Sequence, residues 1–510
     1  MFKERFHIPS MLSLLLVGVF ALLVFGRAMD RDLNHDEHQF IAPGALLSRE
    51  GLLPYRDYPI FHLPNLTFAY AMMDRVSGDL ILSTKLFSAI CTMLTGGLLA
   101  LVCWRSFGAG RKTYAVTGVL LLLVLVFSDR LFDFTIGKTW NHEFPSLCLL
   151  IGVVLTGANV IRDKVWIAVV TGIALGLAVG SRLTFITAAV PLCLASLLYS
   201  TPWKRRLQLV ACAGVGFVMA IIPTIWLWAL SPEAFWFDNF QFPRLRLLDA
   251  SDERAQKTMS LWRKVRFLFK EVILPGCPLF LAYLLVGVAP AIRWFHTRSS
   301  AFFPTALVMI AIPFALAGCF APSRYQYQHY YLFVPLLALG IAYGLPFVAK
   351  ESRRLVILIL SVLALISAGM ALSERSYRWV KTIFDTSAWY VSDVREMATQ
   401  LRQQVDSGKI LTLSPTLPLE AGLPIYPELA TGPFGWRAAH LMDPEKRRRL
   451  KFVAPEDLGA FLENDPPAGI LTGFEKKELE KPLIEYAKAN GYKPMGMFKR
   501  RTLWLRKGPE

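Results

Sequence analysis

Long apolar runs without charged residues recur along the first three quarters of the chain, and short polar segments separate them. Most of these runs last for roughly sixteen to twenty-three residues, which is the length that a helix needs to cross the hydrocarbon core of a bilayer. We therefore predict a multi-span α-helical membrane protein with about eleven transmembrane helices. The predicted spans are 11–26, 80–103, 114–128, 144–161, 165–180, 183–200, 207–229, 272–291, 302–319, 329–348 and 355–372.

Basic residues gather in the gaps that follow alternate spans. By the positive-inside rule these gaps face the cytoplasm, and Lys3 and Arg5 place the N-terminus on the same side. Residues 373–510 then lie outside, as an external or periplasmic domain of a multi-pass plasma (inner) membrane protein. The basic gaps contain Arg105, Arg111 and Lys112; Arg162 and Lys164; Lys204, Arg205 and Arg206; Arg293 and Arg298; and Lys350, Arg353 and Arg354.

A cleaved signal peptide is the alternative explanation of the first apolar run, because Lys3 and Arg5 precede a short core. No small-x-small cleavage motif follows that core, and Arg27 stands where the motif would lie. A retained first helix is therefore favoured.

Composition excludes a soluble protein, because 54% of the residues are hydrophobic and the mean hydropathy is +0.42. The net charge of +17 would suggest nucleic acid in a soluble protein, but here much of it marks cytoplasmic loops, and we expect no nucleic-acid partner. The outer segment 230–271 is nevertheless rich in cations, which favours either a partner carrying lipid phosphates or an amphipathic helix on lipid headgroups. These cations are Arg244, Arg246, Arg254, Arg263, Lys264, Arg266 and Lys270.

The seven cysteines predict no disulfide framework, because they lie in or at the start of apolar spans. In residues 373–510, apolar strand-like runs alternate with helical stretches. This pattern predicts a small α/β domain with strands at 409–413 and 469–472. Helices are predicted where Val394, Met397 and Leu401 recur at helical spacing and after Asp443, and 495–505 predicts a hairpin or edge strand. No phosphate-binding loop or nucleophile elbow appears, so a binding or lid role is expected there.

The first outer loop, 27–79, contains the adjacent carboxylates Asp36 and Glu37, flanked by His35 and His38. Such a group could deprotonate an acceptor hydroxyl or hold a divalent cation, whereas a solvated loop is the commoner meaning of an isolated Asp-Glu pair. The aromatic and proline-rich continuation with Tyr55, Arg56 and Asp57, followed by the amphipathic stretch 61–73, predicts a segment that roofs a cavity at the membrane surface.

A second polar cluster, 129–143, is predicted on the same side of the membrane. It contains Asp129, Asp133, His142 and Glu143. Five of the eight histidines fall in outer loops or at outer span ends, where a polar site could be assembled. Function requires that this cluster and the first loop meet beside the lipid surface.

The third outer feature, 320–328 and the start of the next span, contains Arg324, Tyr325 and His329. Arg324 could bind a phosphate through paired N–H groups while Tyr325 stacks on a sugar, or the segment could be an interfacial aromatic belt with one snorkelling arginine. Arg182, between two spans, is either a second phosphate ligand or an interfacial charge.

These motifs together resemble the GT-C superfamily of polyprenyl-phosphate-sugar transferases, which includes protein O-mannosyltransferases and lipid-A aminoarabinose transferases. The resemblance rests on Asp36-Glu37 fourteen residues before Gly51-Leu52-Leu53-Pro54-Tyr55-Arg56-Asp57, on the acidic second cluster and on the span that ends at Arg182. The Arg324-Tyr325-x-Tyr327-x-His329 start of a late span and the C-terminal domain complete it.

The resemblance implies an inverting hexosyl- or pentosyltransferase in which Asp36 is the base or orienter for the acceptor hydroxyl and Glu37 supports it. His142 and Glu143 would complete the acceptor or metal side, with Asp129 or Asp133 as alternatives to Glu143. Arg182 and Arg324 would balance the lipid-phosphate leaving group. Metal dependence varies within the superfamily, so a divalent metal stays open.

The expected partners are a polyprenyl-phosphate-linked sugar, membrane lipids and a glycan, lipid or protein acceptor of the cell envelope. A lipid-linked sugar transporter or flippase is the main alternative, but it would carry ionisable residues in mid-membrane and matching halves, which the sequence lacks. An envelope polysaccharide ligase or polymerase is a third hypothesis, against which the acidic pair directly after the first span argues.

Overall fold

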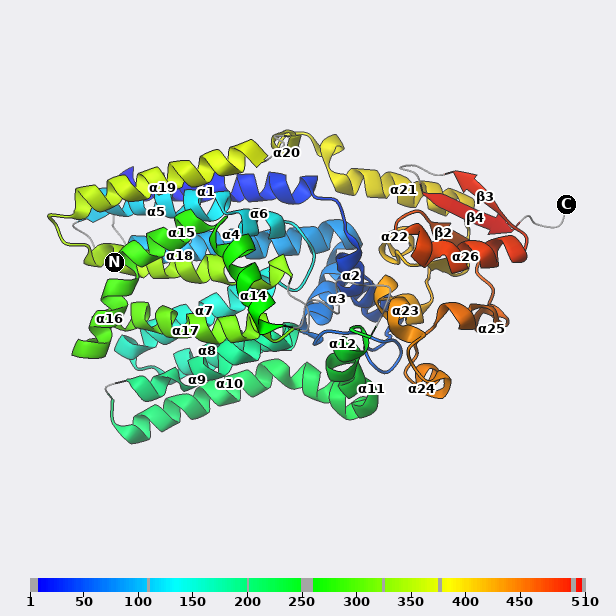
Figure 1. The fold of residues 1–510 in the computed structure, drawn as a ribbon, viewed down its shortest axis with the longest axis horizontal. Coiled ribbons are helices and arrows are strands. Elements are labelled where there is room, and N and C mark those ends of the chain that lie inside the picture. Colours follow the sequence, from blue (N-terminus) through cyan, green and yellow to red (C-terminus); the bar gives the residue numbers. More distant parts are fainter. Residues whose placement is uncertain are drawn as a thin grey trace.

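Long helices lie side by side in a bundle, and the C-terminal segment packs at one end of it, which we call the site end (Figure 1). The structure is a computed structural model and describes residues 8–107, 111–199, 201–248, 260–322, 326–374, 378–496 and 501–506.

Eight helical segments among the described residues are long and apolar enough to cross a membrane, and three shorter apolar helices accompany them. Each predicted span coincides with one of these segments, so the multi-span helical fold class is confirmed. The long segments comprise α1 (Ile8–Asp30), α4 (Leu80–Ser106), α7 (Glu143–Arg162), α10 (Trp203–Leu230), α15 (Cys277–Val286) with α16 (Val288–Thr297), α17 (Phe303–Phe320), α18 (Phe333–Gly344) and α19 (Arg353–Glu374). The shorter helices are α5 (Lys112–Ser128), α8 (Val165–Ser181) and α9 (Ile186–Leu194).

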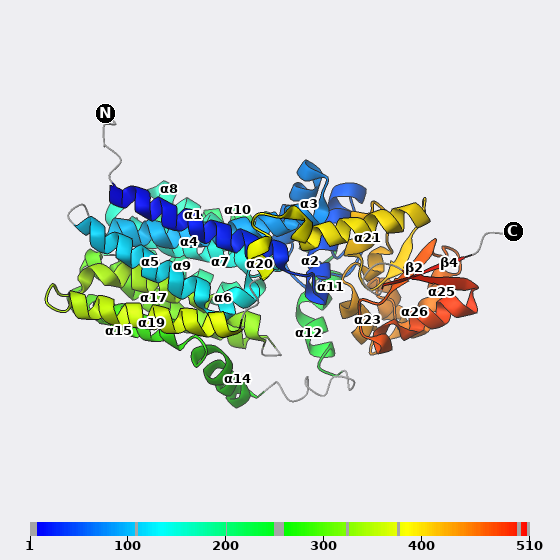
Figure 2. The same cartoon turned by 90° about the horizontal axis from the view of Figure 1, so that it is seen from above.

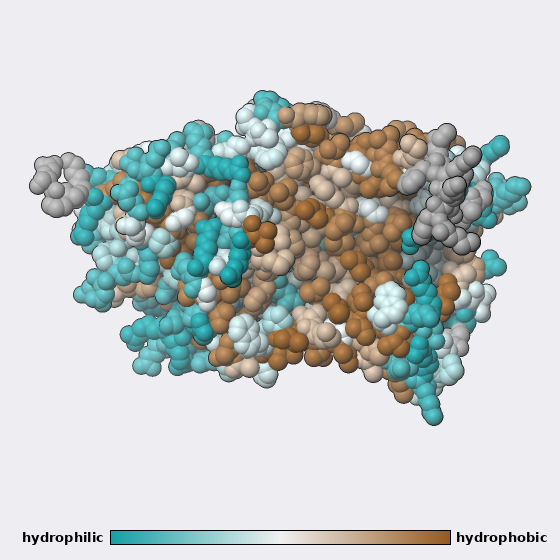
Figure 3. Space-filling model, turned by 180° about the vertical axis from the view of Figure 1, so that it is seen from behind, coloured by the Kyte–Doolittle hydropathy of each residue, from teal (hydrophilic) through white to brown (hydrophobic). Residues whose placement is uncertain are grey.

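On the face seen in Figure 3, a broad hydrophobic belt lies between hydrophilic ends. The belt consists of large apolar side chains that stay exposed, such as Leu14 on α1, Met219 on α10 and Leu365 on α19. An exposed apolar surface of this extent is stable only in contact with lipid tails. The chain is therefore a multi-pass membrane protein.

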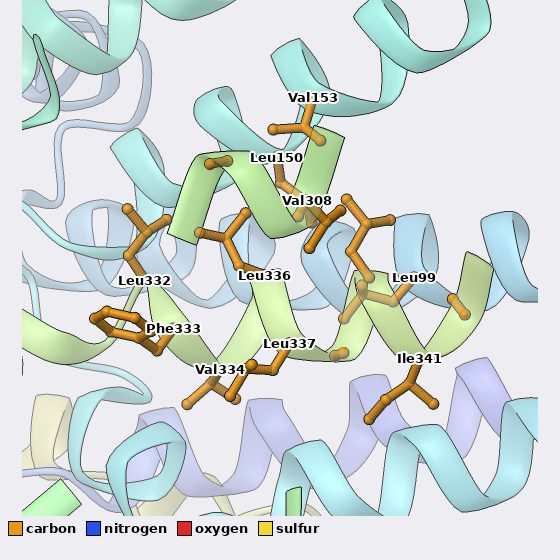
Figure 4. Close-up of a cluster of buried hydrophobic side chains, with 14 of the residues drawn as sticks. Leu99, Leu150, Val153, Val308, Leu332, Phe333, Val334, Leu336, Leu337 and Ile341 are labelled. Carbon is orange, nitrogen blue, oxygen red and sulfur yellow. The ribbon is translucent and has the colours of Figure 1, made fainter. Parts of the chain in front are cut away.

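The bundle core forms around α18, which is buried on all sides. Leu336, Leu337 and Ile341 of α18 pack among Leu99 of α4, Leu150 of α7 and Val308 of α17 (Figure 4). Helices α8 and α10 approach closely at glycines, since a Cβ on Gly172 would lie 1.9 Å from the Ala213 carbonyl oxygen. Such close packing of small residues is typical of helices in membranes.

The C-terminal segment contains a four-stranded sheet in the order β1-β2-β4-β3. Strands β1 (Ile410–Thr412) and β2 (Gly469–Thr472) are parallel, and β4 (Thr502–Arg506) pairs antiparallel with β2 and with β3 (Tyr492–Gly496). The predicted strands and the terminal hairpin are thus confirmed. Helices α21 (Tyr390–Gln404), α22 (Thr416–Glu420), α23 (Pro433–Ala439), α24 (Pro444–Arg449), α25 (Leu458–Leu462) and α26 (Lys477–Ala489) complete the segment.

The C-terminal segment shares a hydrophobic core with the first outer loop. That loop folds into α2 (His35–Ala45) and α3 (Asn65–Ser77). Ile41 of α2 and Tyr70 of α3 belong to the same buried cluster as Leu401 of α21 and Ile410 of β1. The loop and the C-terminal segment therefore stabilise each other.

This shared core predicts the effect of one truncation. Leu401→Ala should lower the unfolding free energy of the site end by about 2–5 kcal/mol, because Leu401 is fully buried and the truncation leaves a cavity. Limited proteolysis in detergent should then cleave segment 46–64 faster than in the wild type. Gln403→Ala, at an exposed position of the same helix, is the control. Unchanged proteolysis in Leu401→Ala would show that the two segments fold independently.

Candidate active-site cavity at the site end

A cavity of about 610 Å³ lies where the bundle meets the C-terminal segment. Its walls come from α2, from the loops 58–64 and 136–142, from residues 321–322 and 326–328, and from the residues that follow α8. They also include α12 (Phe242–Leu245), α14 (Leu261–Phe267) and α23. In Figure 2, α12 and α14 stand out on one flank of the molecule. The cavity thus gathers residues from all the predicted outer segments.

Asp36 faces this cavity because of the way in which α2 begins. Asn34 caps the helix: its side-chain oxygen accepts a hydrogen bond from the Asp36 N–H at 2.8 Å, while Glu37 Oε2 accepts one from the Asn34 N–H at 2.8 Å. This capping box fixes the first turn, where the helix dipole stabilises a carboxylate. Of the described residues that line the cavity, Asp36 is the only one with a carboxylate.

Glu37 points away from the cavity and joins the first loop to the second cluster. Its Oε1 accepts hydrogen bonds from the backbone N–H and the hydroxyl of Thr139, both at 2.7 Å, and both residues are fully buried. Gly137 lets this segment pass close to α1, because a Cβ there would lie 2.3 Å from the Cα of Ala28. The expected meeting of segments 27–79 and 129–143 is therefore confirmed.

The second cluster contributes amide and imidazole groups to the cavity, and its acidic residues lie elsewhere. Asn141 and His142 line the cavity. Asp129 caps α6 (Arg130–Thr135), Asp133 forms ion pairs with Arg27 and Arg31, and Glu143 is buried at the start of α7. The expectation that Asp129, Asp133 or Glu143 contributes directly to the site is not met by the lining of the cavity.

Arg182 is positioned by these two lining residues. Its Nη1 donates to Asn141 Oδ1 at 3.2 Å and lies 2.9 Å from His142 Nδ1. Burial lowers the pKa of the Arg182 guanidinium to about 10, so it stays charged near neutral pH. Burial and the nearby Arg182 lower the pKa of His142 well below its usual value, so His142 is neutral and accepts. No carboxylate among the described residues forms an ion pair with Arg182.

Three further cations among the described residues line the cavity. Arg244 and Arg246 follow the start of α12, and the Arg246 guanidinium lies 5.0 Å from the ring centroid of Phe434 in α23. Lys264 of α14 donates to the carbonyl oxygens of Phe320 and Pro322, each at 2.6 Å. The cation-rich segment 230–271 therefore supplies three cations to the lining of the cavity.

The third outer feature is described in part. His329 lines the cavity, and its ring centroid lies 6.4 Å from that of His142. Arg324 and Tyr325 lie outside the described residues, whereas Pro322 and Gln326 on either side of them line the cavity.

Tyr55, Arg56 and Asp57 form a turn behind the cavity and do not line it. Tyr55 has a positive φ of 66°, and its hydroxyl donates to the His62 carbonyl oxygen at 2.7 Å. Asp57 accepts from the Leu53 N–H at 2.7 Å and pairs with Arg56. The turn therefore positions Phe61 and the residues after it instead of contacting a ligand.

His35 lies beside the cavity rather than in its wall. Its Nε2 is 3.5 Å from Asp36 Oδ1, and its ring packs near Phe434 at 5.9 Å between centroids. This contact places an imidazole next to the only lining carboxylate.

Gln39 and Phe40 line the cavity although the sequence did not mark them as parts of a site, whereas His62 is one of the five outer histidines noted in the sequence. Gln39 and Phe40 share a face of α2 with Asp36, so the helical spacing i, i+3 and i+4 would have found them once the Asn34-x-x-Glu37 capping box is recognised. His62 contacts Gln39 Oε1 and Asn141 Nδ2, both at 3.2 Å, and burial lowers its pKa to about 3. It belongs to a neutral polar wall that also includes Asn239 and Gln328.

Among the described residues, no three His, Cys, Asp or Glu side chains gather in a group that could hold a metal ion. The chemistry available to the cavity is of another kind. Cations can bind an anion, amides can bind hydroxyl groups, and one carboxylate can accept a proton.

Three solved structures resemble the chain over nearly its whole length. ArnT from Cupriavidus metallidurans, bound to undecaprenyl phosphate, matches with a TM-score of 0.64 at 13% identity and covers 98% of this chain and 99% of its own; the apo state of ArnT gives 0.63. The archaeal oligosaccharyltransferase AglB from Archaeoglobus fulgidus, in complex with an inhibitory peptide and a dolichol-phosphate, has a TM-score of 0.50 at 11% identity, covering 97% of this chain and 74% of its own. No protein-family model and no curated protein sequence matches. The chain therefore shares the overall fold of ArnT and AglB.

The Glu37 carboxylate gives a prediction about the assembly of the site. Glu37→Gln replaces a carboxylate, which accepts hydrogen bonds from three donors, by an amide. The NH₂ group of that amide then faces a donor and cannot accept its hydrogen bond. The unfolding free energy should fall by about 1–3 kcal/mol, and Thr139→Val should add little to this loss in the double variant. Thermal unfolding of the purified protein in detergent measures both, with the exposed Glu463→Gln as control. If the two substitutions lowered the unfolding free energy additively, the hydrogen bond between Glu37 and Thr139 would be contradicted.

Proposed function

We propose that the chain is a GT-C glycosyltransferase that moves a sugar from a polyprenyl phosphate to an acceptor hydroxyl of an envelope glycan, lipid or protein. The reaction takes place in the cavity at the site end, which faces the non-cytoplasmic side, and the N-terminus lies in the cytoplasm. The proposal rests on one observation: among the described residues that line the cavity, there is one carboxylate, Asp36, and there are four cations.

The cations suit the leaving group of this reaction. When the bond between the anomeric carbon and the phosphate oxygen breaks, the lipid phosphate gains negative charge, which fixed cations stabilise in a partly dry site. Arg182 serves this role because its guanidinium is charged and free of carboxylates. Arg246 and Lys264 also line the cavity and attract the anionic donor. Arg324, Tyr325 and His329 are proposed as further donor contacts.

Asp36 suits the acceptor side. A carboxylate near the acceptor hydroxyl accepts its proton while the oxygen attacks the anomeric carbon. One direct displacement needs no enzyme nucleophile and inverts the anomeric configuration. Glu37 then acts as a positioning residue, because its bonds to Asn34 and Thr139 orient the helix turn that presents Asp36.

The neutral wall suits the transferred sugar. Gln39, Asn141 and Asn239 can donate to and accept from sugar hydroxyl groups, and His62 is uncharged at neutral pH. Phe40 and Trp140 supply apolar ring surface, which fits the hydrogen-bearing face of a sugar ring.

The carboxylate is tested by Asp36→Asn. Cells lacking the gene should lose one sugar of defined mass from an envelope glycan, lipid or protein, as detected by mass spectrometry. The wild-type gene should restore it, whereas Asp36→Asn should lower the rate of transfer by about 10²–10⁴-fold, the usual contribution of a general base.

The control for this test is Asp406→Asn, which makes the same chemical change at an exposed position. It should restore the sugar fully. Normal levels of the sugar with Asp36→Asn, at equal protein abundance, would overturn the role of Asp36.

The donor side is tested by Arg182→Gln with undecaprenyl phosphate as the probe. The loss of one charge-assisted contact should weaken binding of undecaprenyl phosphate by about ten- to a hundredfold. In the wild type, the contribution of Arg182 to binding should be lost as the pH rises past about 10, where the guanidinium loses its proton. Arg402→Gln, at an exposed position, should bind like the wild type. Equal affinities of the Arg182→Gln variant and the wild type would exclude Arg182 as a phosphate ligand.

A further inference from the structure

A second recess, separate from the active-site cavity, lies on the side of the bundle formed by α1, α5 and α19. It is a groove of about 190 Å³ that continues to Trp379 in the short helix α20 (Arg378–Lys381). Figure 1 shows α1, α5 and α19 running side by side towards α20. Its lining shares no residue with that of the cavity.

The groove is apolar along its whole length. All its lining side chains are hydrophobic except that of Ser128, and the Ser128 hydroxyl is satisfied internally by the Val124 carbonyl oxygen at 2.6 Å and by Ser367 Oγ at 2.7 Å. A flexible polar ligand would lose its hydration there without gaining hydrogen bonds. Only a hydrocarbon chain fits this chemistry.

One polar group among the lining residues lacks a partner. Trp379 is 6% exposed, and its indole Nε1 has no hydrogen-bond partner among the described residues. The nearby Trp389 differs, since its Nε1 donates to the Thr382 carbonyl oxygen at 2.7 Å. Indole N–H can only donate, and a buried donor without an acceptor is costly. An acceptor oxygen at this end of the groove would therefore satisfy the Trp379 indole N–H.

The source of both the hydrocarbon and the oxygen is the surrounding bilayer. Val19 of α1 and Leu372 of α19 line the groove and are 45% and 56% exposed within the hydrophobic belt, so the groove opens towards lipid. A glycerophospholipid carries an ester carbonyl at the end of each acyl chain, and tryptophan commonly occupies the interfacial depth where these esters lie.

We propose that the groove binds one acyl chain of a glycerophospholipid and that Trp379 Nε1 donates a hydrogen bond to the ester carbonyl of that chain. The bound lipid covers the seam between α1, α5 and α19. The groove is separate from the proposed donor site, so the result of a lipid-binding test does not depend on the transferase activity.

Native mass spectrometry of the full chain, purified from membranes in mild detergent, tests this site. The wild type should retain one glycerophospholipid. Trp379→Phe keeps the ring but removes the donor, and it should weaken retention by about three- to tenfold, which is the range for one lost hydrogen bond. Ala368→Phe fills the groove and should abolish retention. Leu365→Phe, on the lipid-facing side of the same helix, should leave it unchanged.

A second measurement uses only the wild-type protein. A phosphatidylglycerol with a photoreactive diazirine in its acyl chain should crosslink to α1, α5 or α19, and unlabelled phosphatidylglycerol should compete. Retention that is equal in the wild type, Trp379→Phe and Ala368→Phe would overturn the proposal. So would an isoprenoid chain in place of the phospholipid, or crosslinks confined to other helices.

Discussion

The Glu37 carboxylate is the interaction on which the arrangement of the site depends. It is fully buried, yet three donors from two separate outer segments satisfy it. Breaking any of these bonds would leave a charge in a poorly hydrated place, which costs more than the bond itself contributes. The segments at 34–37 and 139 are therefore held together, and Asp36, one position earlier, has to face the cavity on the other side of the helix turn.

A second constraint is the position of charge beside a membrane. Among the described residues, four cations and one carboxylate line the same cavity at the end of a hydrophobic bundle, although fixed positive charges repel each other. Two of them are held by neutral oxygens: Arg182 by Asn141, and Lys264 by the carbonyls of Phe320 and Pro322. Such partners orient a cation without neutralising it, so its charge remains available to an anionic ligand.

The bundle could be predicted from the sequence because bilayer thickness converts an uncharged run into a helix of known length. The separate strands of the C-terminal sheet were also recognisable, since each is a local pattern. The spatial partners of individual side chains could not be recognised from the sequence. Whether Asp133 contacts a ligand or Arg27, and whether Asp57 lines a cavity or closes a turn, depends on contacts between distant segments. The membership of α21 and α2 in one hydrophobic core is of the same kind. The capping box at Asn34 and Glu37 was the one local signal that would have separated the roles of the adjacent carboxylates.

The central claim, that the cavity joins a lipid phosphate to Asp36, is tested most directly by an experimental structure of the full chain with undecaprenyl phosphate. The account predicts the phosphate inside the cavity, within hydrogen-bonding distance of the Arg182 guanidinium, with the prenyl chain leaving towards the hydrophobic belt and Asp36 facing the space beside the phosphate. A phosphate bound outside this cavity, beyond the reach of Arg182 and with its own set of cations, would contradict it.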